Sequence, residues 1–143
     1  GFRLFAFARR TCGRKLRILP FKRYEGKEKK MSDCIFCSIS NHEIPSNTVY
    51  EDDKIICFHD LEPQAPVHVL VIPKKHIRSL DQLEECDKDL MGYIMLKIPE
   101  IARSLELKNG YRVVINTGED AFQTVKHIHV HIMGKRKLTW PPG

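Results

Sequence analysis

The stretch His127-Ile128-His129-Val130-His131-Ile132 decides how the rest of this 143-residue chain is interpreted. It alternates imidazole and aliphatic side chains, and successive residues of a β-strand point to opposite faces of a sheet. The pattern therefore predicts a strand whose apolar face packs on a core and whose other face carries three histidines about 6.5–7 Å apart. A single strand histidine is usually a structural residue, but three of the chain's seven in one stretch indicate a functional site.

Two kinds of chemistry suit such an array. Imidazole is a common zinc ligand. A neutral imidazole can also attack phosphorus while its neighbours donate hydrogen bonds to the phosphate oxygens. Three ligands on one strand spread too widely to close around one tetrahedral ion, so the array favours a nucleophile combined with a phosphate clamp.

The sequence on either side predicts an α+β domain. Runs typical of short strands occur at residues 49–50, 54–58, 67–72, 111–116 and 125–133. Helical spacing predicts one long helix, through Leu90, Ile94, Ile98, Ile101 and Leu105. Pro99 lies inside that pattern and lacks an amide hydrogen, so we expect a kink or a shortened helix. A capping box is expected at Asp81-x-x-Glu84.

The charge is divided unevenly along the chain. The full sequence has 24 basic and 18 acidic side chains, for a formal net charge of +6. Residues 1–30 hold eleven basic and two acidic side chains, a net +9, so residues 31–143 carry −3. A positive charge would suggest a nucleic-acid partner, but this charge belongs to the leader. We therefore predict a leader at residues 1–30, one domain at residues 31–143, and no nucleic-acid partner.

Three interpretations of the leader stay open. It interleaves Phe and Leu with Arg, which resembles a mitochondrial transit peptide, although it contains no serine. It could instead be an upstream extension without structure of its own, or a binding tail. No apolar run reaches the ~18–20 residues that cross a bilayer, so we expect no membrane partner. Five cysteines without a convincing signal sequence favour the cytoplasm, or mitochondria if the leader is a transit peptide.

The chain is identified as a member of the histidine triad (HIT) family, because residues 127–132 resemble its signature of three histidines separated by apolar residues. The similarity covers Asp33 to Gly143. Further blocks resemble the Hint branch of the family, namely Phe58-His59-Asp60-Leu61, Pro63-Gln64-Ala65-Pro66, Leu70-Val71-Ile72-Pro73-Lys74-Lys75-His76-Ile77 and Trp140-Pro141-Pro142-Gly143.

The resemblance implies a HIT-like fold, with an antiparallel sheet, one long and one short helix, and a symmetric homodimer. It also implies hydrolysis of a purine nucleoside 5′-monophosphoramidate through a covalent nucleotidyl-histidine. By position in the motifs, His129 would be the nucleophile, and His131 and His68 would contact the phosphoryl group.

The same resemblance implies a set of substrate-binding residues. Asp60 would hold the ribose hydroxyls, although it could simply cap a turn. Polar residues near the phosphate and leaving group would be Asn116, Gln123 and Thr124, with Asn116 alternatively a turn residue. The purine would lie against Phe36, Ile39, Phe58 and Leu61, which we expect to be partly core. Trp140 would reach the partner's active site, or pack within its own subunit.

One departure and one further site follow from the resemblance. Phe122 stands where the family usually has glycine, which leaves the leaving-group preference open. Many HIT proteins resemble this chain in having a C-x-x-C pair that, with two histidines, binds a structural zinc. By position the ligands would be Cys34, Cys37, His76 and His127, a normal tetrahedral set. Two buried thiols or a disulfide are the alternatives for the cysteines, and Cys12, Cys57 and Cys86 are scattered singly.

Two other functions remain open. One is a nucleotide-binding scaffold with little turnover, and the other is a dinucleoside polyphosphate hydrolase of the Fhit-like branch. The presence of nucleophile, clamp and ribose carboxylate together favours an enzyme over a scaffold. The Trp140-Pro-Pro-Gly ending favours the Hint branch over the Fhit-like branch.

Overall fold

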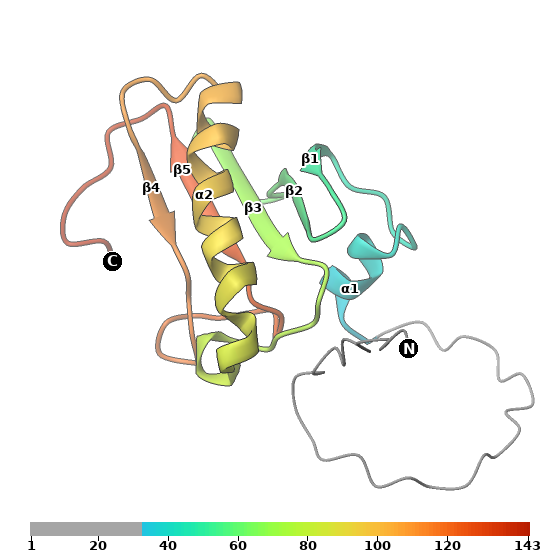
Figure 1. The fold of residues 1–143 in the computed structure, drawn as a ribbon. Helices are drawn as coiled ribbons and strands as arrows, with labels where there is room; N and C mark the ends of the chain where they lie inside the picture. The colour runs from blue at the N-terminus through green and yellow to red at the C-terminus, as the bar shows by residue number, and fades with distance from the viewer. Residues whose placement is uncertain (1–32) are drawn as a thin grey trace, which may run out of the picture.

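One antiparallel sheet of five strands organises residues 33–143, the part of the chain that the computed structural model describes (Figure 1). Its spatial order is β1-β2-β3-β5-β4. The strands are β1 (Thr48–Glu51), β2 (Ile55–His59), β3 (Val67–Pro73), β4 (Tyr111–Val114) and β5 (Val130–Gly134). The leader at residues 1–30 and the predicted domain boundary at residue 31 lie outside the described residues.

Each face of the sheet is covered by one helix. The long helix α2 (Lys88–Ser104) packs against alternate residues of the central strands, including Val69 and Val71 of β3. The short helix α1 (Ile35–Ser40) packs against the residues between them, Leu70 and Ile72. All seven residues of β3 are buried as a result, which explains why every residue of the strand except His68 is apolar. The α+β fold, with one long and one short helix on an antiparallel sheet, is therefore confirmed.

The alternation of faces places two histidines on the α1 side of the sheet. In β3, His68 lies between Val67 and Val69, which belong to the α2 core. In β5, His131 lies between Val130 and Ile132, which belong to the same core. Since β3 and β5 are antiparallel neighbours with Leu70 opposite His131, the two histidines are diagonal neighbours across the strands.

The predicted strand at residues 125–133 is wrong at its beginning, because β5 begins only at Val130. Its ladder with β3 ends at the pair Val71–Val130. The segment before it bonds instead to the chain that follows β3, with the Ile128 amide donating to the Ile77 carbonyl at 2.7 Å. His127 and His129 therefore lie in an irregular segment before the strand, so one strand does not place all three histidines on one face.

One helix prediction needs correction, and another is settled in part. Of the two outcomes expected at Pro99, a shortened helix is excluded, because α2 continues through Pro99 to Ser104. The kink stays a prediction. Pro99 lacks the amide hydrogen that would donate to the carbonyl of Met95, a residue on the exposed side of the helix. The capping box is formed by Glu84 and Asp87, whose carboxylate accepts the Glu84 amide at 3.0 Å, and not by Asp81 and Glu84.

Within residues 33–143, no helix combines the length and the apolar character that crossing a membrane requires. The predicted homodimer stays a prediction. Exposed apolar side chains that a second copy could cover lie on α2 and on the edge strand β4, at Met95, Leu96, Tyr111 and Val113.

Candidate functional site

The imidazole of His129 is oriented by the backbone just before it. Its Nδ1 lies 2.7 Å from the carbonyl oxygen of His127. A carbonyl can only accept, so in the neutral ring Nδ1 carries the hydrogen and Nε2 has the lone pair. The ring is 5% exposed and packs edge-on against Phe36, with ring centroids 5.1 Å apart. This is the tautomer that a nucleophilic histidine needs.

His131 and His68 form a directed chain of hydrogen bonds. The Gln64 amide donates to Nδ1 of His68 at 3.0 Å, so in the neutral ring the hydrogen of His68 is on Nε2. That Nε2 lies 2.9 Å from Nδ1 of His131 and donates to it. The hydrogen of His131 is then on its own Nε2, a buried atom without a hydrogen-bond partner among the described residues. The chain therefore ends in an unused N–H donor beside His129.

Burial keeps this pair of rings neutral. It lowers the pKa of His131 to about 4, with smaller contributions from the neighbouring His129 and His68, while Asp60 acts in the opposite direction. The pKa of His68 is also lowered by burial, an effect that the charge of Asp60 partly offsets. Neutral rings at pH 7 are what the hydrogen-bond directions require.

Asp60 caps a turn, which is one of the two roles considered for it, and it also lies beside His68. One carboxylate oxygen accepts the Glu62 amide at 2.8 Å, which caps the turn after β2. The other lies 3.4 Å from Nε2 of His68. Its contact with ribose stays a prediction, but the structure brings it to His68.

The predicted apolar slot divides into two parts. Phe36, Ile39 and Phe58 are buried together in the core between α1 and the sheet. Leu61 is 95% exposed and does not belong to this cluster. A purine contact for the four residues stays a prediction, as does the partner contact of Trp140, whose 82% exposure excludes close packing within its own subunit.

The polar residues predicted near the leaving group differ in their surroundings. Asn116 is half-buried after β4, and Thr124 is exposed. Gln123 is buried, and its amide anchors the loop: Nε2 donates to the carbonyls of Arg78 and Val125, and Oε1 accepts the Gly118 amide. Both amide hydrogens of Gln123 are thus already used, and contact between its side chain and a substrate stays a prediction.

Phe122 occupies a conformation that explains the usual glycine at this position. Its φ is +62°, in the left-handed region that bulky residues rarely adopt. The side chain is 79% exposed. The chain therefore retains the loop geometry that glycine favours and adds an exposed aromatic ring beside Gln123 and Thr124.

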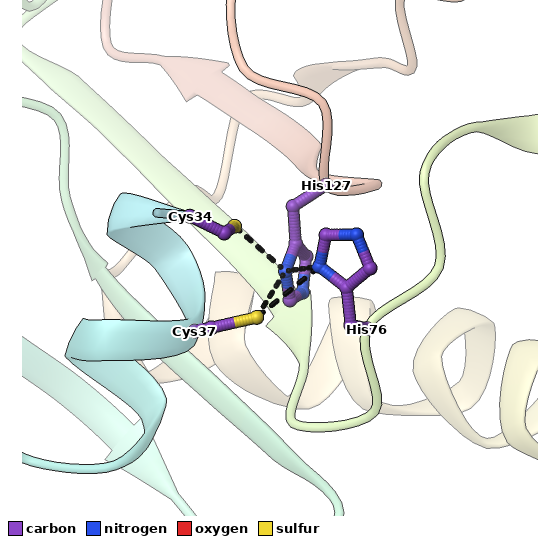
Figure 2. Close-up of side chains that lie close together, drawn as sticks. All are labelled: Cys34, Cys37, His76 and His127. Carbon is purple, nitrogen blue, oxygen red and sulfur yellow. Dashed lines mark hydrogen bonds between the residues drawn. The ribbon is translucent and has the colours of Figure 1, made fainter. Parts of the chain in front are cut away.

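A second group of predicted residues comes together around His127, two positions before His129. Cys34, preceding α1, and Cys37, within it, face His76 from the segment after β3 and His127 from the segment before β5 (Figure 2). Nδ1 of His127 lies 3.5 Å from each sulfur and 3.1 Å from Nδ1 of His76. Cys37 Sγ lies 3.1 Å from Nδ1 of His76.

These distances fit a tetrahedral zinc ion. With usual zinc bond lengths, two nitrogen ligands lie about 3.3 Å apart and a nitrogen and a sulfur about 3.5 Å apart. The far nitrogen of His127, Nε2, lies 2.8 Å from the carbonyl oxygen of Pro73 and donates to it. That bond leaves the lone pair of Nδ1 facing the other three residues, which is the usual arrangement of a metal-ligating histidine. Burial also lowers the pKa of His127 to about 4, so the ring is neutral.

A second group with metal-ligand atoms, formed by Asp60, His68 and His131, does not fit a metal in the same way. Here the far nitrogen of His68 accepts an amide hydrogen, so the near nitrogen carries a proton where a metal would need a lone pair. Histidine thus presents a lone pair that suits a metal ion at the cysteine site, and an N–H donor at the site formed by Asp60, His68 and His131.

Two backbone groups in the site could not be identified from the sequence. The Gln64 amide and the Pro73 carbonyl set the tautomers of His68 and His127. Gln64 lies in one of the motifs quoted above, but a hydrogen bond from a backbone group does not depend on residue type and so leaves no pattern in the sequence. The only indication in the sequence was that family motifs lie both before β3 and within it.

The low pKa of His131 predicts that acid destabilises the fold. The folded-state pKa of about 4 lies below the unfolded value of 6.5, so the unfolded chain binds the proton more readily between these values. Stability is therefore lost as pH falls from about 6.5 towards 4. Between pH 7 and pH 4.5, the free energy of unfolding of His131→Asn should fall by about 2 kcal/mol less than that of wild type, after allowance for the partial exposure of His131. Denaturant unfolding at the two pH values measures both losses. Equal losses in the two proteins would contradict this.

Comparisons with known proteins agree with the fold. A family model described as the HIT domain matches residues 41–138. Protein HitA of Neisseria gonorrhoeae is 49% identical over 104 residues, which is 73% of this chain and 97% of that protein. A HIT family hydrolase from Legionella pneumophila Philadelphia 1 aligns with a TM-score of 0.76 at 43% identity, covering 78% of this chain and all of that one. A histidine triad nucleotide-binding protein from Candida albicans aligns with a TM-score of 0.66 at 33% identity, covering 76% and 83% of the two chains. With its histidines in the same arrangement that the sequence signature describes, this chain belongs to the HIT family.

Proposed function

We propose that this protein hydrolyses purine nucleoside 5′-monophosphoramidates through a covalent nucleotidyl intermediate on His129. The observation that carries the proposal is the hydrogen bond from Nδ1 of His129 to the His127 carbonyl, which leaves the Nε2 lone pair available for attack. The names of two similar proteins, a HIT family hydrolase and a histidine triad nucleotide-binding protein, support the two halves of the proposal.

In the first step, Nε2 of His129 attacks the α-phosphorus and forms a phosphorus–nitrogen bond. The bond from phosphorus to the leaving amine breaks, and its electron pair stays on the amine, which takes up a proton from water. A neutral imidazole can do this near pH 7, whereas a lysine at its ordinary pKa is protonated and has no lone pair.

In the second step, water attacks the same phosphorus and displaces Nε2. The water loses a proton, and the nucleoside 5′-monophosphate leaves. Division of one difficult displacement into two easier ones is the usual advantage of covalent catalysis.

His131 would stabilise both transition states from the side. Its Nε2–H is buried and has no partner among the described residues, so it needs no rearrangement to bond a phosphoryl oxygen. Because the ring is neutral, its N–H donates without requiring an extra charge in the pocket. Donors placed in this way typically contribute about a hundredfold or more to the rate.

We also propose that Cys34, Cys37, His76 and His127 hold a structural zinc ion. Zinc in such a closed four-ligand site supplies folding energy and no open position for substrate. The four residues tie α1 to the segments beside β3 and β5. The carbonyl of one of them, His127, is the group that orients His129, so a fixed His127 keeps the nucleophile in its tautomer.

The activity is tested with adenosine and guanosine phosphoramidates, with amine release as the measurement. His129→Ala should lower turnover at least about a thousandfold, because it removes the nucleophile. His42→Ala is the matched control, since His42 is an exposed imidazole outside the cluster. Unchanged turnover in His129→Ala would sink the hydrolase proposal, and nucleotide binding by a wild type without turnover would favour the scaffold.

The zinc proposal predicts about one zinc per chain in the purified protein, measured by elemental mass spectrometry. Cys34→Ser and Cys37→Ser should each lose most of this metal and unfold at a lower temperature. Cys57→Ala is the matched control, because Cys57 is a thiol buried in the core and outside the cluster. A wild type isolated without metal, and unable to take up added zinc, would rule the proposal out.

A further inference from the structure

Arg136, two residues beyond the end of β5, reaches back to the loop that precedes β3. Its Nε–H donates to the carbonyl of Gln64 at 2.9 Å, although the two residues are 72 positions apart in the sequence. Nη1 donates to the carbonyl of Lys137 at 3.3 Å, which holds the guanidinium in place. Both of these hydrogen bonds of Arg136, made within residues 33–143, are to backbone oxygens.

The backbone before Arg136 is turned by a residue in an unusual conformation. Lys135 has a φ of +64°, in the left-handed region. A side-chain-bearing residue held there costs free energy and persists only where its surroundings fix it. The turn follows the pair Val67–Gly134, the last of the β3–β5 ladder, and so lies at the end of β3 that Gln64 precedes. The turn at Lys135 and the guanidinium of Arg136 thus both help to position the loop that contains Gln64.

Gln64 is the first residue in the series of hydrogen bonds that runs through His68 to His131. Its carbonyl accepts from Arg136, while its amide donates to Nδ1 of His68. Its side-chain Nε2 donates to the carbonyl of Glu62 at 3.0 Å. The position of the Gln64 amide relative to His68 therefore depends on one hydrogen bond within the loop and one from Arg136, which follows the end of β5 that pairs with the start of β3.

The direction of the hydrogen bonds from Gln64 through His68 to His131 determines whether His131 can donate to a phosphoryl oxygen. If the Gln64 amide moved away, Nδ1 of His68 could carry the hydrogen, and Nε2 would become an acceptor. His131 would then have to donate from Nδ1, and its Nε2 would present a lone pair. A lone pair facing a phosphoryl oxygen is repulsive, whereas the observed N–H donor is attractive.

We propose that Arg136 is a positioning residue that fixes the tautomers of His68 and His131 through Gln64. This inference rests on the proposed hydrolysis at His129 for its effect on the rate, but not for its effect on the tautomers. Arg136 acts through the loop, and contact with the substrate is not part of its role.

The kinetic test uses phosphoramidate turnover by the full-length protein. Arg136→Ala should lower kcat about three- to tenfold, the size expected for loss of one hydrogen bond, and should leave KM within about twofold. Arg136→Lys should recover part of kcat, because an ammonium group can also donate to the Gln64 carbonyl. Lys137→Ala is the matched control, since it removes the same charge from the next residue without removing the Gln64 contact.

Nitrogen NMR of the imidazoles in the substrate-free protein gives the readout that a merely structural role would not change. The His68 ring should be protonated at Nε2 in wild type and Lys137→Ala, and should become a mixture of tautomers in Arg136→Ala. An unchanged His68 tautomer in Arg136→Ala would overturn the proposal. So would a raised KM with unchanged kcat, which would mean direct attraction of the substrate. If wild type shows no turnover, the proposed function fails, and the NMR result alone decides the role of Arg136.

Discussion

The hydrogen bond from Nδ1 of His129 to the carbonyl of His127 is the interaction on which the site depends, at 2.7 Å. An imidazole has two nitrogens, and the partner of one determines what the other can do. The same rule assigns the remaining rings. The Pro73 carbonyl leaves His127 with a lone pair towards the cysteines, and the Gln64 amide leaves His68 with a donor towards His131. Backbone groups thus set the tautomers of three histidines, His129, His127 and His68, and each ring has a different role as a result.

His127 joins the cysteine site to His129, the proposed nucleophile. The side chain of His127 is fully buried among Cys34, Cys37 and His76, and its carbonyl accepts a hydrogen bond from the His129 ring. Phe36 of α1 packs edge-on against the rings of both His127 and His129, with centroid separations of 6.0 and 5.1 Å. A change at the cysteine site can therefore reach His129 through one residue, without passing through the sheet.

Sequence reasoning identified which side chains gather but not how they are held. The alternation in residues 127–132 and the C-x-x-C pair, interpreted through the family resemblance, predicted the members of both clusters. It placed all three triad histidines in one strand, whereas β5 begins at Val130 because the chain before it bonds to Ile77. The roles of Gln64 and Pro73 could not be predicted, since any residue type offers the same carbonyl, and nearly any offers the amide. The continuation of α2 through Pro99 could not be decided from spacing, since a proline inside a helical pattern can either end the helix or only bend it.

The central claim is that backbone partners fix the protonated nitrogen of each ring, and imidazole nitrogen NMR tests it most directly, because hydrogen positions are otherwise inferred from partners. At neutral pH the account predicts that His129 is protonated at Nδ1, and that His68 and His131 are protonated at Nε2. A His129 ring protonated at Nε2 would contradict it, because the atom proposed to attack phosphorus would then have no lone pair.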